Sequence, residues 1–354
     1  MRTVTVKASS AYTVKIGAGL LESIGEEAAA LGKAEKICIV SDSNVFPLYG
    51  KPVTERLEQS GFQVSHFVFP AGEHMKNAGT FLSLLNHLAV IGLTRTDLIL
   101  ALGGGVVGDL AGFAAACYMR GIRYIQVPTT LLAAVDSSVG GKTAIDLDAG
   151  KNLAGAFWQP SLVLCDTDTL GTLPEEFFRD GCAEVIKYAI LYDPDLFSEL
   201  KQTGFLFERE AVIARCITLK RNVVMDDEFD TGSRMKLNLG HTIGHGVEAR
   251  SDYSVSHGHA VSIGMAIVAK AAAQQGLCSA DCCQQILELL KTFRLPTETQ
   301  YSADDLYTYT LSDKKRCGDS IQLIIPREIG FCEIRSMPIF QLKSFIEAGL
   351  CHGS

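Results

Sequence analysis

The sequence lacks the patterns that would place it in a membrane, in an oxidising compartment or on nucleic acid. Its most apolar run, residues 98–119, is rich in glycine and alanine and contains Asp109, which favours a buried turn and helix over a membrane span. The eleven cysteines are an odd number without a Cys-x-x-Cys pair, so free thiols in a reducing cytoplasm are expected. The formal charge of −8 argues against a nucleic-acid or anionic-membrane surface. No leader pattern opens the chain, because residues 1–6 alternate as a strand does.

The sequence does contain enough material for two folded domains. A chain of 354 residues exceeds one ordinary core, and 47% apolar with 20% charged residues is typical of a folded protein. Compact apolar runs at 36–40, 62–69, 98–102, 124–128 and 162–166 alternate with helix-length segments, as in a parallel sheet covered on both faces. After about residue 174 helical spacing prevails, with one short strand pair near 321–334. We predict an α/β domain with a mostly parallel, Rossmann-like sheet over residues 1–173 and a mainly α-helical domain over 174–354.

Four of the eight histidines, His241, His245, His257 and His259, lie within nineteen residues. Imidazole is the commonest neutral metal ligand and the usual acid or base near neutral pH, so the cluster favours a metal or proton-transfer site over ordinary capping histidines. Glu184 with His241 and His257 would form the open three-ligand set of a catalytic zinc. The local alternative is His241 with His245, which are four apart on one helix face.

Residues 103–108 read Gly-x-Gly-x-x-Gly between an expected strand and an expected helix, which formally matches a dinucleotide-binding loop. Glycines there let backbone N–H groups approach a pyrophosphate at a helix N-terminus. No acidic residue near Tyr124 is placed to bind the ribose, but Asp42 ends an earlier strand and could take that role. The alternative is a tight structural turn.

Residues 136–143 end in Gly-Lys-Thr but do not form a P-loop, because Asp136 or Ser137 stands where its first glycine is required. A glycine-rich loop ending in Lys142, with Lys151 nearby, still suits an anion. Further cations follow at Lys220, Arg221, Arg234, Lys314 and Lys315. Together they indicate a substrate with carboxylate or phosphate groups.

Residues 103–110, 136–143, 179–187 and 234–242, taken in order, resemble the 3-dehydroquinate synthase family. The likeness runs from roughly residue 10 to 345; the separate motifs are shared with other sugar-phosphate cyclases, and the glycine loop with iron-type alcohol dehydrogenases. The resemblance implies conversion of 3-deoxy-D-arabino-heptulosonate 7-phosphate to 3-dehydroquinate and phosphate, in the shikimate pathway to chorismate and the aromatic amino acids. It also implies recycled NAD, one divalent ion (zinc or cobalt), a homodimer and a cytoplasmic enzyme.

The resemblance also assigns roles to individual residues. It places the metal on Glu184, His241 and His257. It places NAD against Asp42, Asn44, Glu73, His74, Met75, Lys76, Asn77, Ala78, Gly104, Gly105, Val106, Val107, Gly108, Asp109, Thr129, Thr130, Asp136, Lys142, Lys151, Thr169, Leu170, Gly171, Thr172 and Leu173. Substrate phosphate would meet Lys142, Asn152, His245, Lys314 or its neighbour Lys315, and Arg120 from across a dimer interface. Substrate carboxylate would meet Lys220, Arg234 and Asn238, Lys187 would lie near the ring hydroxyls, and His245 would transfer the proton of the oxidised alcohol.

One position departs from the family pattern, which usually has Glu where this chain has His259. If that position orients a metal ligand, the pH or metal profile is expected to change, and if it only caps a helix, little changes. The alternatives are another sugar-phosphate cyclase, a metal- and NAD-dependent polyol dehydrogenase that releases NADH, and a non-enzymatic metal-binding scaffold. Lys220, Arg234 and Asn238 favour an acidic substrate, because buried cations without an anionic partner are costly.

Overall fold

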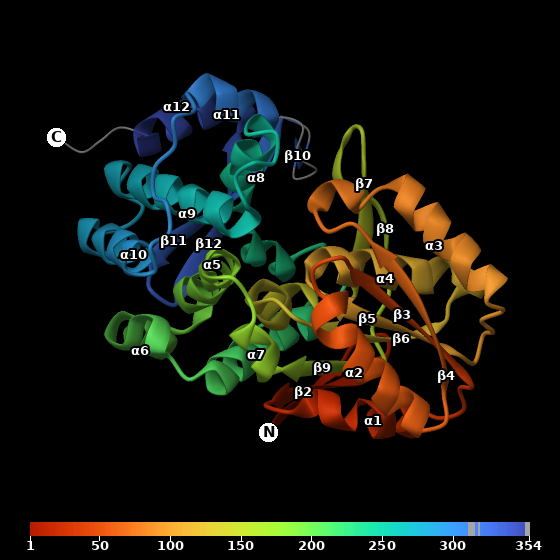
Figure 1. Cartoon of the computed structure of the whole chain (residues 1–354). Helices are drawn as coiled ribbons and strands as arrows, with labels where there is room; N and C mark the ends of the chain where they lie inside the picture. Colours follow the sequence, from red (N-terminus) through yellow and green to blue (C-terminus); the bar gives the residue numbers. More distant parts are fainter. Residues whose placement is uncertain (311–315, 318, 351–354) are drawn as a thin grey trace. The chain divides into compact units, whose positions relative to one another are not determined.

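The computed structural model of the chain describes residues 1–310, 316–317 and 319–350 (Figure 1). Internal contacts divide the chain into two compact units. The first comprises Met1–Pro174 together with Arg209–Phe229, and the second comprises Glu175–Glu208 together with the chain from Asp230 onward. Lys314 and Lys315, one of which we expected at the substrate phosphate, lie outside the described residues.

The first unit is built on a seven-stranded sheet in the order β1-β2-β9-β6-β5-β3-β4. Every neighbouring pair is parallel except the N-terminal hairpin of β1 and β2. The strands are β1 (Arg2–Lys7), β2 (Ala11–Gly17), β3 (Lys36–Asp42), β4 (Gln63–Phe69), β5 (Leu98–Gly103), β6 (Arg123–Pro128) and β9 (Leu162–Asp166). Each of the five predicted apolar runs forms one of these strands, and the predicted mostly parallel α/β fold is confirmed.

Alternate residues of the central strands pack on opposite faces of this sheet. Cys38, Val40, Ile99 and Ala101 enter one core, with α3 (Ala78–Val90) and α4 (Gly105–Cys117). Ile37, Ile39, Leu98 and Leu100 enter the other core, with α1 (Ile24–Ala30) and α2 (Phe46–Gln59). Because both faces are covered, β5 is buried along its whole length, which explains its unbroken apolar sequence.

Three further elements complete the first unit. The antiparallel pair β7 (Lys142–Leu147) and β8 (Gly150–Phe157) forms a separate ribbon next to α4. The short helix η4 (Ala133–Ser137) follows β6, and the long helix α7 (Arg209–Asp226) packs against η4 and β1. The described part of the chain has no helix that is both long enough and apolar enough to cross a membrane.

The second unit is mainly helical, as predicted. Its helices are α5 (Glu175–Tyr192), α6 (Pro194–Thr203), α8 (His241–Arg250), α9 (His257–Gln274), α10 (Ala280–Thr292), α11 (Ala303–Thr310) and α12 (Ile339–Leu350). The small sheet consists of β10 (Arg316–Cys317), β11 (Ser320–Glu328) and β12 (Phe331–Pro338). Helix α9 is buried over most of its length and packs against α5, α8, α10 and α12, while its first residue, His257, is partly buried.

Candidate active site

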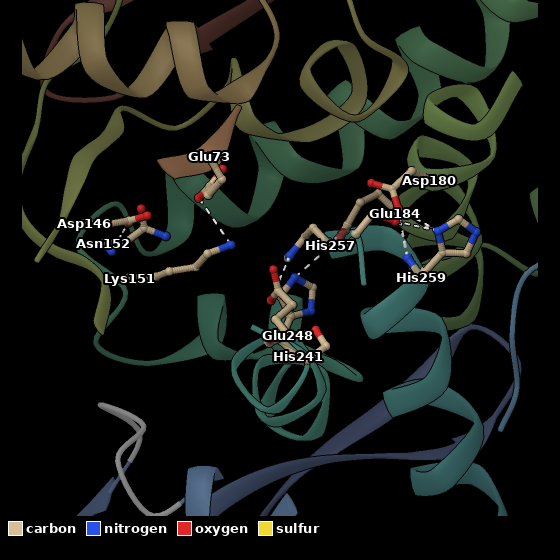
Figure 2. A network of polar contacts seen from close by, with 12 residues as sticks. Glu73, Asp146, Lys151, Asn152, Asp180, Glu184, His241, Glu248, His257 and His259 are labelled. Carbon is tan, nitrogen blue, oxygen red and sulfur yellow. Dashed lines mark hydrogen bonds and ion pairs between the residues drawn. The ribbon is translucent and has the colours of Figure 1, made fainter. Parts of the chain in front are cut away.

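A cluster of one carboxylate and two imidazoles lies inside the second unit (Figure 2). Glu184 projects from the middle of α5, while His241 and His257 are the first residues of α8 and α9. The Oε1 atom of Glu184 lies 3.4 Å from Nε2 of His241 and 3.3 Å from Nε2 of His257. The structure thus brings together the Glu/His/His set that the sequence suggested.

Glycines allow the three helices to approach one another so closely. Gly240 adopts a left-handed φ of 78° just before α8. A Cβ atom added at Gly264 of α9 would lie 1.9 Å from the carbonyl oxygen of Gly240, and one added at Gly258 would lie 2.0 Å from that of Asp180 on α5. Because no larger residue fits at these two α9 positions, backbone contact with α8 and α5 keeps His257 near His241 and Glu184.

The geometry of the cluster fits a bound metal ion better than hydrogen bonding. Both contacts to Glu184 exceed the usual N–H···O length, whereas two ligands about 2.1 Å from one tetrahedral ion stand about 3.4 Å apart. Both carboxylate oxygens of Glu184 are buried; Oε2 pairs with the ammonium of Lys187, while Oε1 faces the two imidazoles and has no hydrogen bond of acceptable geometry within the described residues. A buried carboxylate oxygen left in this state is costly, and a metal ion between it and the two rings would supply its partner.

The charges around the cluster keep Glu184 ionised. Burial alone would raise the pKa of Glu184, but the ammonium of Lys187 and the imidazole of His241 outweigh it and hold that pKa well below its usual range. Burial lowers the pKa of His241 to about 4, which keeps this ring neutral, as a metal ligand must be. Burial would also lower the pKa of His257, but Glu248 and Glu184 raise it to about 10. In the absence of an ion His257 therefore holds a proton between two carboxylates, and a metal would displace it.

A second group of possible ligands shares His257 with the first. His245, Glu248 and His257 also present ligand atoms within 4.8 Å of one another. The Nδ1 atom of His257 lies 3.4 Å from Oε2 of Glu248, and the ring centroids of His245 and His257 lie 6.2 Å apart. His245, the predicted proton-transfer residue, is therefore a neighbour of the metal cluster within the second unit.

His259 lies in a different group of polar side chains. Its backbone N–H donates to Oδ1 of Asp180 at 2.9 Å, and its Nδ1 contacts the hydroxyl of Ser256, which also bonds Asp180. Ser256 is the N-cap residue of α9, so the group connects the start of α9 to α5. The effect of His259 on pH or metal dependence stays a prediction.

The remaining predicted residues of the second unit are mostly buried. Lys187 is 1% exposed and forms an ion pair with Glu184 one turn away on α5. Arg234, 2% exposed, lies in η7 (Ser233–Asn238). Asn238 ends this short helix, and its Nδ2 donates to the carbonyl of Met235 at 3.1 Å.

In the first unit, the glycine loop joins β5 to α4, as its sequence predicts. A Cβ added at Gly104 would stand 3.0 Å from the side chain of Thr130, and one at Gly105 would stand 3.2 Å from that of Ser137. Thr129 donates its backbone N–H to the carbonyl of Gly103 at 3.0 Å, while its buried hydroxyl has no hydrogen-bond partner in the described residues. A close-packed glycine loop beside an unsatisfied hydroxyl fits a dinucleotide phosphate.

A polar network near α4 and the β7–β8 ribbon contains several predicted cofactor residues (Figure 2). The ammonium of Lys76 lies 2.8 Å from Oδ1 of Asn152, 3.2 Å from Asp109 and 3.0 Å from Glu73. Lys151 lies 3.3 Å from the same carboxylate oxygen of Glu73. Burial raises the pKa of Asp109 to about 6 despite the attraction of Lys76.

Asp146 belongs to this network, although no sequence pattern singles it out. Its carboxylate accepts from the backbone N–H of Asn152 at 2.8 Å, and its own N–H donates to the carbonyl of Lys76 at 2.8 Å. These bonds hold Asn152 at a left-handed φ of 54° and connect the ribbon to residues 76–77. The pairing depends on the register of β7 and β8, which periodicity does not reveal.

The other predicted residues of the first unit lie at the ends of strands, on its surface or in its helices. Asp42 ends β3 and accepts from the N–H groups of Asn44 and Val45 at 2.8 and 3.0 Å. Lys142 begins β7 and is exposed. Arg120 is exposed at the end of η3 (Tyr118–Arg120), with a left-handed φ of 66°. Lys220 of α7 contacts Asp136 of η4. We expected Lys220 at the substrate carboxylate and Asp136 at NAD, and the structure pairs these two residues with each other.

The fold of the chain is that of the sugar-phosphate cyclases. It matches a 2-deoxy-scyllo-inosose synthase crystallised with carbaglucose-6-phosphate, NAD+ and Co2+ (26% identity, TM-score 0.88, 98% of this chain and 99% of that one). It also matches a 2-epi-5-epi-valiolone synthase from Streptomyces hygroscopicus subsp. jinggangensis with NAD+ and Zn2+ bound (27% identity, TM-score 0.89, 99% and 98%). An iron-containing alcohol dehydrogenase at 15% identity and a TM-score of 0.70 shares the fold alone.

Within this class, the chain belongs to the 3-dehydroquinate synthase family. Residues 66–180 match the model described as 3-dehydroquinate synthase N-terminal, and residues 181–316 match the C-terminal one. The chain is 42% identical to the 3-dehydroquinate synthase of Enterococcus faecalis, covering 97% of this chain and 98% of that one. It is 44% identical to that of Vibrio atlanticus, covering 94% and 95%. The family inferred from the four sequence motifs is confirmed.

Proposed function

We propose that this protein converts 3-deoxy-D-arabino-heptulosonate 7-phosphate to 3-dehydroquinate and phosphate, using NAD as a recycled cofactor and one divalent metal ion. The observation that carries the proposal is membership of the 3-dehydroquinate synthase family over both halves of the chain. The structural relatives crystallised with NAD+ and Co2+ or Zn2+ support the choice of cofactors. An alcohol dehydrogenase activity has weaker support, since the likeness to those enzymes is at fold level.

Glu184, His241 and His257 would hold the metal, and the glycine loop with Asp42, Thr129 and its neighbours would hold NAD. When bound, NAD accepts and returns the hydride of one substrate alcohol, and the metal polarises the substrate oxygens. Lys187 keeps Glu184 charged although solvent hardly reaches either side chain.

Each unit contains polar and charged residues that suit one group of an acidic, phosphorylated substrate. Arg234 supplies a buried guanidinium suited to bidentate binding of a carboxylate, and Asn238 lies at the other end of the same short helix. Lys142 and Asn152 stand at the β7–β8 ribbon and would bind the phosphate. His245, next to the metal cluster, would exchange a proton with the reacting alcohol.

The decisive experiment measures phosphate release from 3-deoxy-D-arabino-heptulosonate 7-phosphate by cobalt-loaded protein with substoichiometric NAD, while absorbance is followed for NADH. Many phosphates released per NAD without lasting NADH would establish recycled redox chemistry. Stoichiometric NADH without phosphate would replace the proposal with a dehydrogenase. Release of neither phosphate nor NADH would point to a different cyclase substrate.

The proposal also includes a cytoplasmic homodimer, in which Arg120 of each subunit reaches the phosphate site of its partner. Mixing subunits of two inactive variants tests this shared site. Arg120→Ala and His241→Ala should each be inactive alone. In mixed dimers, the subunit that retains its metal ligands would receive an intact Arg120 from its partner. Random reassociation should then restore about a quarter of wild-type activity, because half of the dimers are mixed and each has one complete site. No recovery in demonstrably mixed dimers would contradict the shared site.

A further inference from the structure

The carboxylate of Glu248 lies against the metal cluster without belonging to the Glu184, His241 and His257 set. Glu248 is 2% exposed and lies on α8, two turns after His241. Its Oε2 accepts a hydrogen bond from Nδ1 of His257 at 3.4 Å, and Figure 2 shows the two side chains joined by this contact. The other ring nitrogen of His257, Nε2, faces Glu184 at 3.3 Å. One imidazole is thus held between two buried carboxylates.

His241 is arranged in the same way with a different acceptor. Its Nδ1 lies 3.1 Å from the backbone carbonyl of Leu239, and its Nε2 lies 3.4 Å from Glu184. In both rings the Nδ1 side has an oxygen acceptor and the Nε2 side faces Glu184. Such an acceptor keeps the proton on Nδ1 and leaves the Nε2 lone pair for a metal, and it makes the ring a stronger ligand. A carboxylate has a larger effect on ligand strength than a carbonyl, because it carries a full charge.

The backbone of Glu248 also holds the segment that leads to His257. Its carbonyl oxygen accepts from the N–H of Tyr253 at 2.9 Å and from the hydroxyl of Ser251 at 2.8 Å. The same hydroxyl accepts from the N–H of Val255 at 3.2 Å. These bonds close the turn between α8 and α9, where Tyr253 has a left-handed φ of 59°. The backbone of Glu248 therefore helps to fix the path of the chain into His257, while its side chain faces the ring.

We propose that Glu248 is a positioning residue that orients His257 and strengthens it as a metal ligand. The inference rests on the proposed function in so far as Glu184, His241 and His257 bind the ion. An alternative use of the same atoms is a second metal position formed by Glu248, His245 and His257. The two uses exclude each other at Nδ1 of His257, because a nitrogen that donates a proton to Glu248 has no lone pair for an ion.

The test compares cobalt binding by wild type, Glu248→Gln and Glu248→Ala, using chelator competition and the visible spectrum of bound Co2+. The amide of Glu248→Gln can still accept from Nδ1 but lacks the charge, so we expect weaker binding with a nearly normal spectrum. Glu248→Ala should weaken binding about 10- to 100-fold and change the spectrum, because the ring is no longer held. Thermal unfolding of the metal-free proteins shows whether each variant is folded.

Asp180→Asn is the matched control. Asp180 is a buried carboxylate whose polar contacts among the described residues are with Ser256 and His259 at the start of α9, and not with the rings of His241 or His257. If Glu248 acts through the ring of His257, Asp180→Asn should lower thermal stability while leaving cobalt affinity and spectrum nearly unchanged. Equal effects of Asp180→Asn and Glu248→Ala on cobalt affinity would reduce Glu248 to a general structural role and overturn the proposal.

The remaining outcomes separate this inference from the proposed function. Unchanged affinity and spectrum in Glu248→Ala would overturn it, and so would a wild type that binds no divalent ion. If wild type binds two cobalt ions per chain and Glu248→Ala binds one, Glu248 is a metal ligand and not a positioning residue. Cobalt binding could depend on Glu248 in a protein that releases no phosphate from the substrate. That result would support the positioning role of Glu248 and reject the proposed reaction.

Discussion

The ammonium of Lys220 contacts Asp136 twice, donating to its backbone carbonyl at 2.8 Å and pairing with its carboxylate. Lys220 lies on α7 and Asp136 in η4, eighty-four positions apart in the sequence. The side chains are only 9% and 17% exposed, so water screens their charges poorly. This contact joins α7 to the helical turn that follows β6.

Lys220→Ala should destabilise the protein by about 3 kcal/mol, because it removes the ammonium that offsets the charge of a largely buried carboxylate. Urea unfolding of the metal-free protein measures this loss. Arg221→Ala is the control, since the Arg221 guanidinium bonds only its exposed neighbour Asn222 among the contacts of the described residues, and it should change stability by less than about 0.5 kcal/mol. Similar effects of the two substitutions would contradict the importance of the contact.

Lys187→Met should destabilise the metal-free protein more than the metal-loaded protein. Lys187 and Glu184 are 1% and 0% exposed, so loss of the ammonium removes the nearest positive charge from a buried carboxylate, at a cost of about 3 to 5 kcal/mol. A bound divalent ion would neutralise the same carboxylate and reduce the loss. Urea unfolding with and without zinc measures the difference. The exposed pair Lys201 and Glu288 provides a control, because Lys201→Met should cost less than about 1 kcal/mol in both states.

Metal removal should lower the unfolding temperature, and restored metal should raise it in a concentration-dependent way. An ion that binds only the folded chain stabilises it by about 2.7 kcal/mol when its free concentration is a hundred times its dissociation constant. Thermal unfolding after chelator treatment and during zinc titration tests this. His241→Ala should abolish the zinc-dependent shift, and a shift that survives in this variant would place the ion elsewhere.

Asp109→Asn should change how stability depends on pH. Burial raises the pKa of Asp109 from 3.8 to about 6, so between these values the folded protein holds a proton that the unfolded chain has lost. Stability linked to this group is therefore present at low pH and lost as pH rises through about 6, by on the order of 1 to 3 kcal/mol.

An asparagine cannot titrate, so relative to wild type the Asp109→Asn variant should be more stable at pH 7 than at pH 4.5. Urea unfolding of both proteins at the two pH values isolates the contribution of Asp109, since all other groups are common to both. An identical pH dependence in the two proteins would show that Lys76 keeps Asp109 ionised throughout this range.

Much of the first unit could be predicted because its central strands are buried on both faces. Unbroken apolar runs such as residues 36–40 and 98–102 occur for that physical reason, and each became a strand. Strand order could not be predicted, because periodicity says which face a residue takes and not which strand lies beside it. The position of β9 between β2 and β6 is such a case.

The candidate site was predictable to a similar extent. His241 and His257 stood out because histidine is rare in the chain and clustered there. Glu248 and Asp146 did not, because an acidic residue in a helix or hairpin is usually solvated. Their importance comes from contacts with His257 and Asn152 that exist only once α8 meets α9 and β7 pairs with β8.

The assignment of Arg209–Phe229 to the first unit has a consequence for how the protein is made. During synthesis, β1 and η4 leave the ribosome long before α7, the helix that packs on them. The first unit therefore stays incomplete while residues 175–208 of the second are already being produced. A gene divided after codon 174 would for the same reason encode a first fragment that lacks α7, and a second fragment that carries the second unit together with a helix belonging to the first.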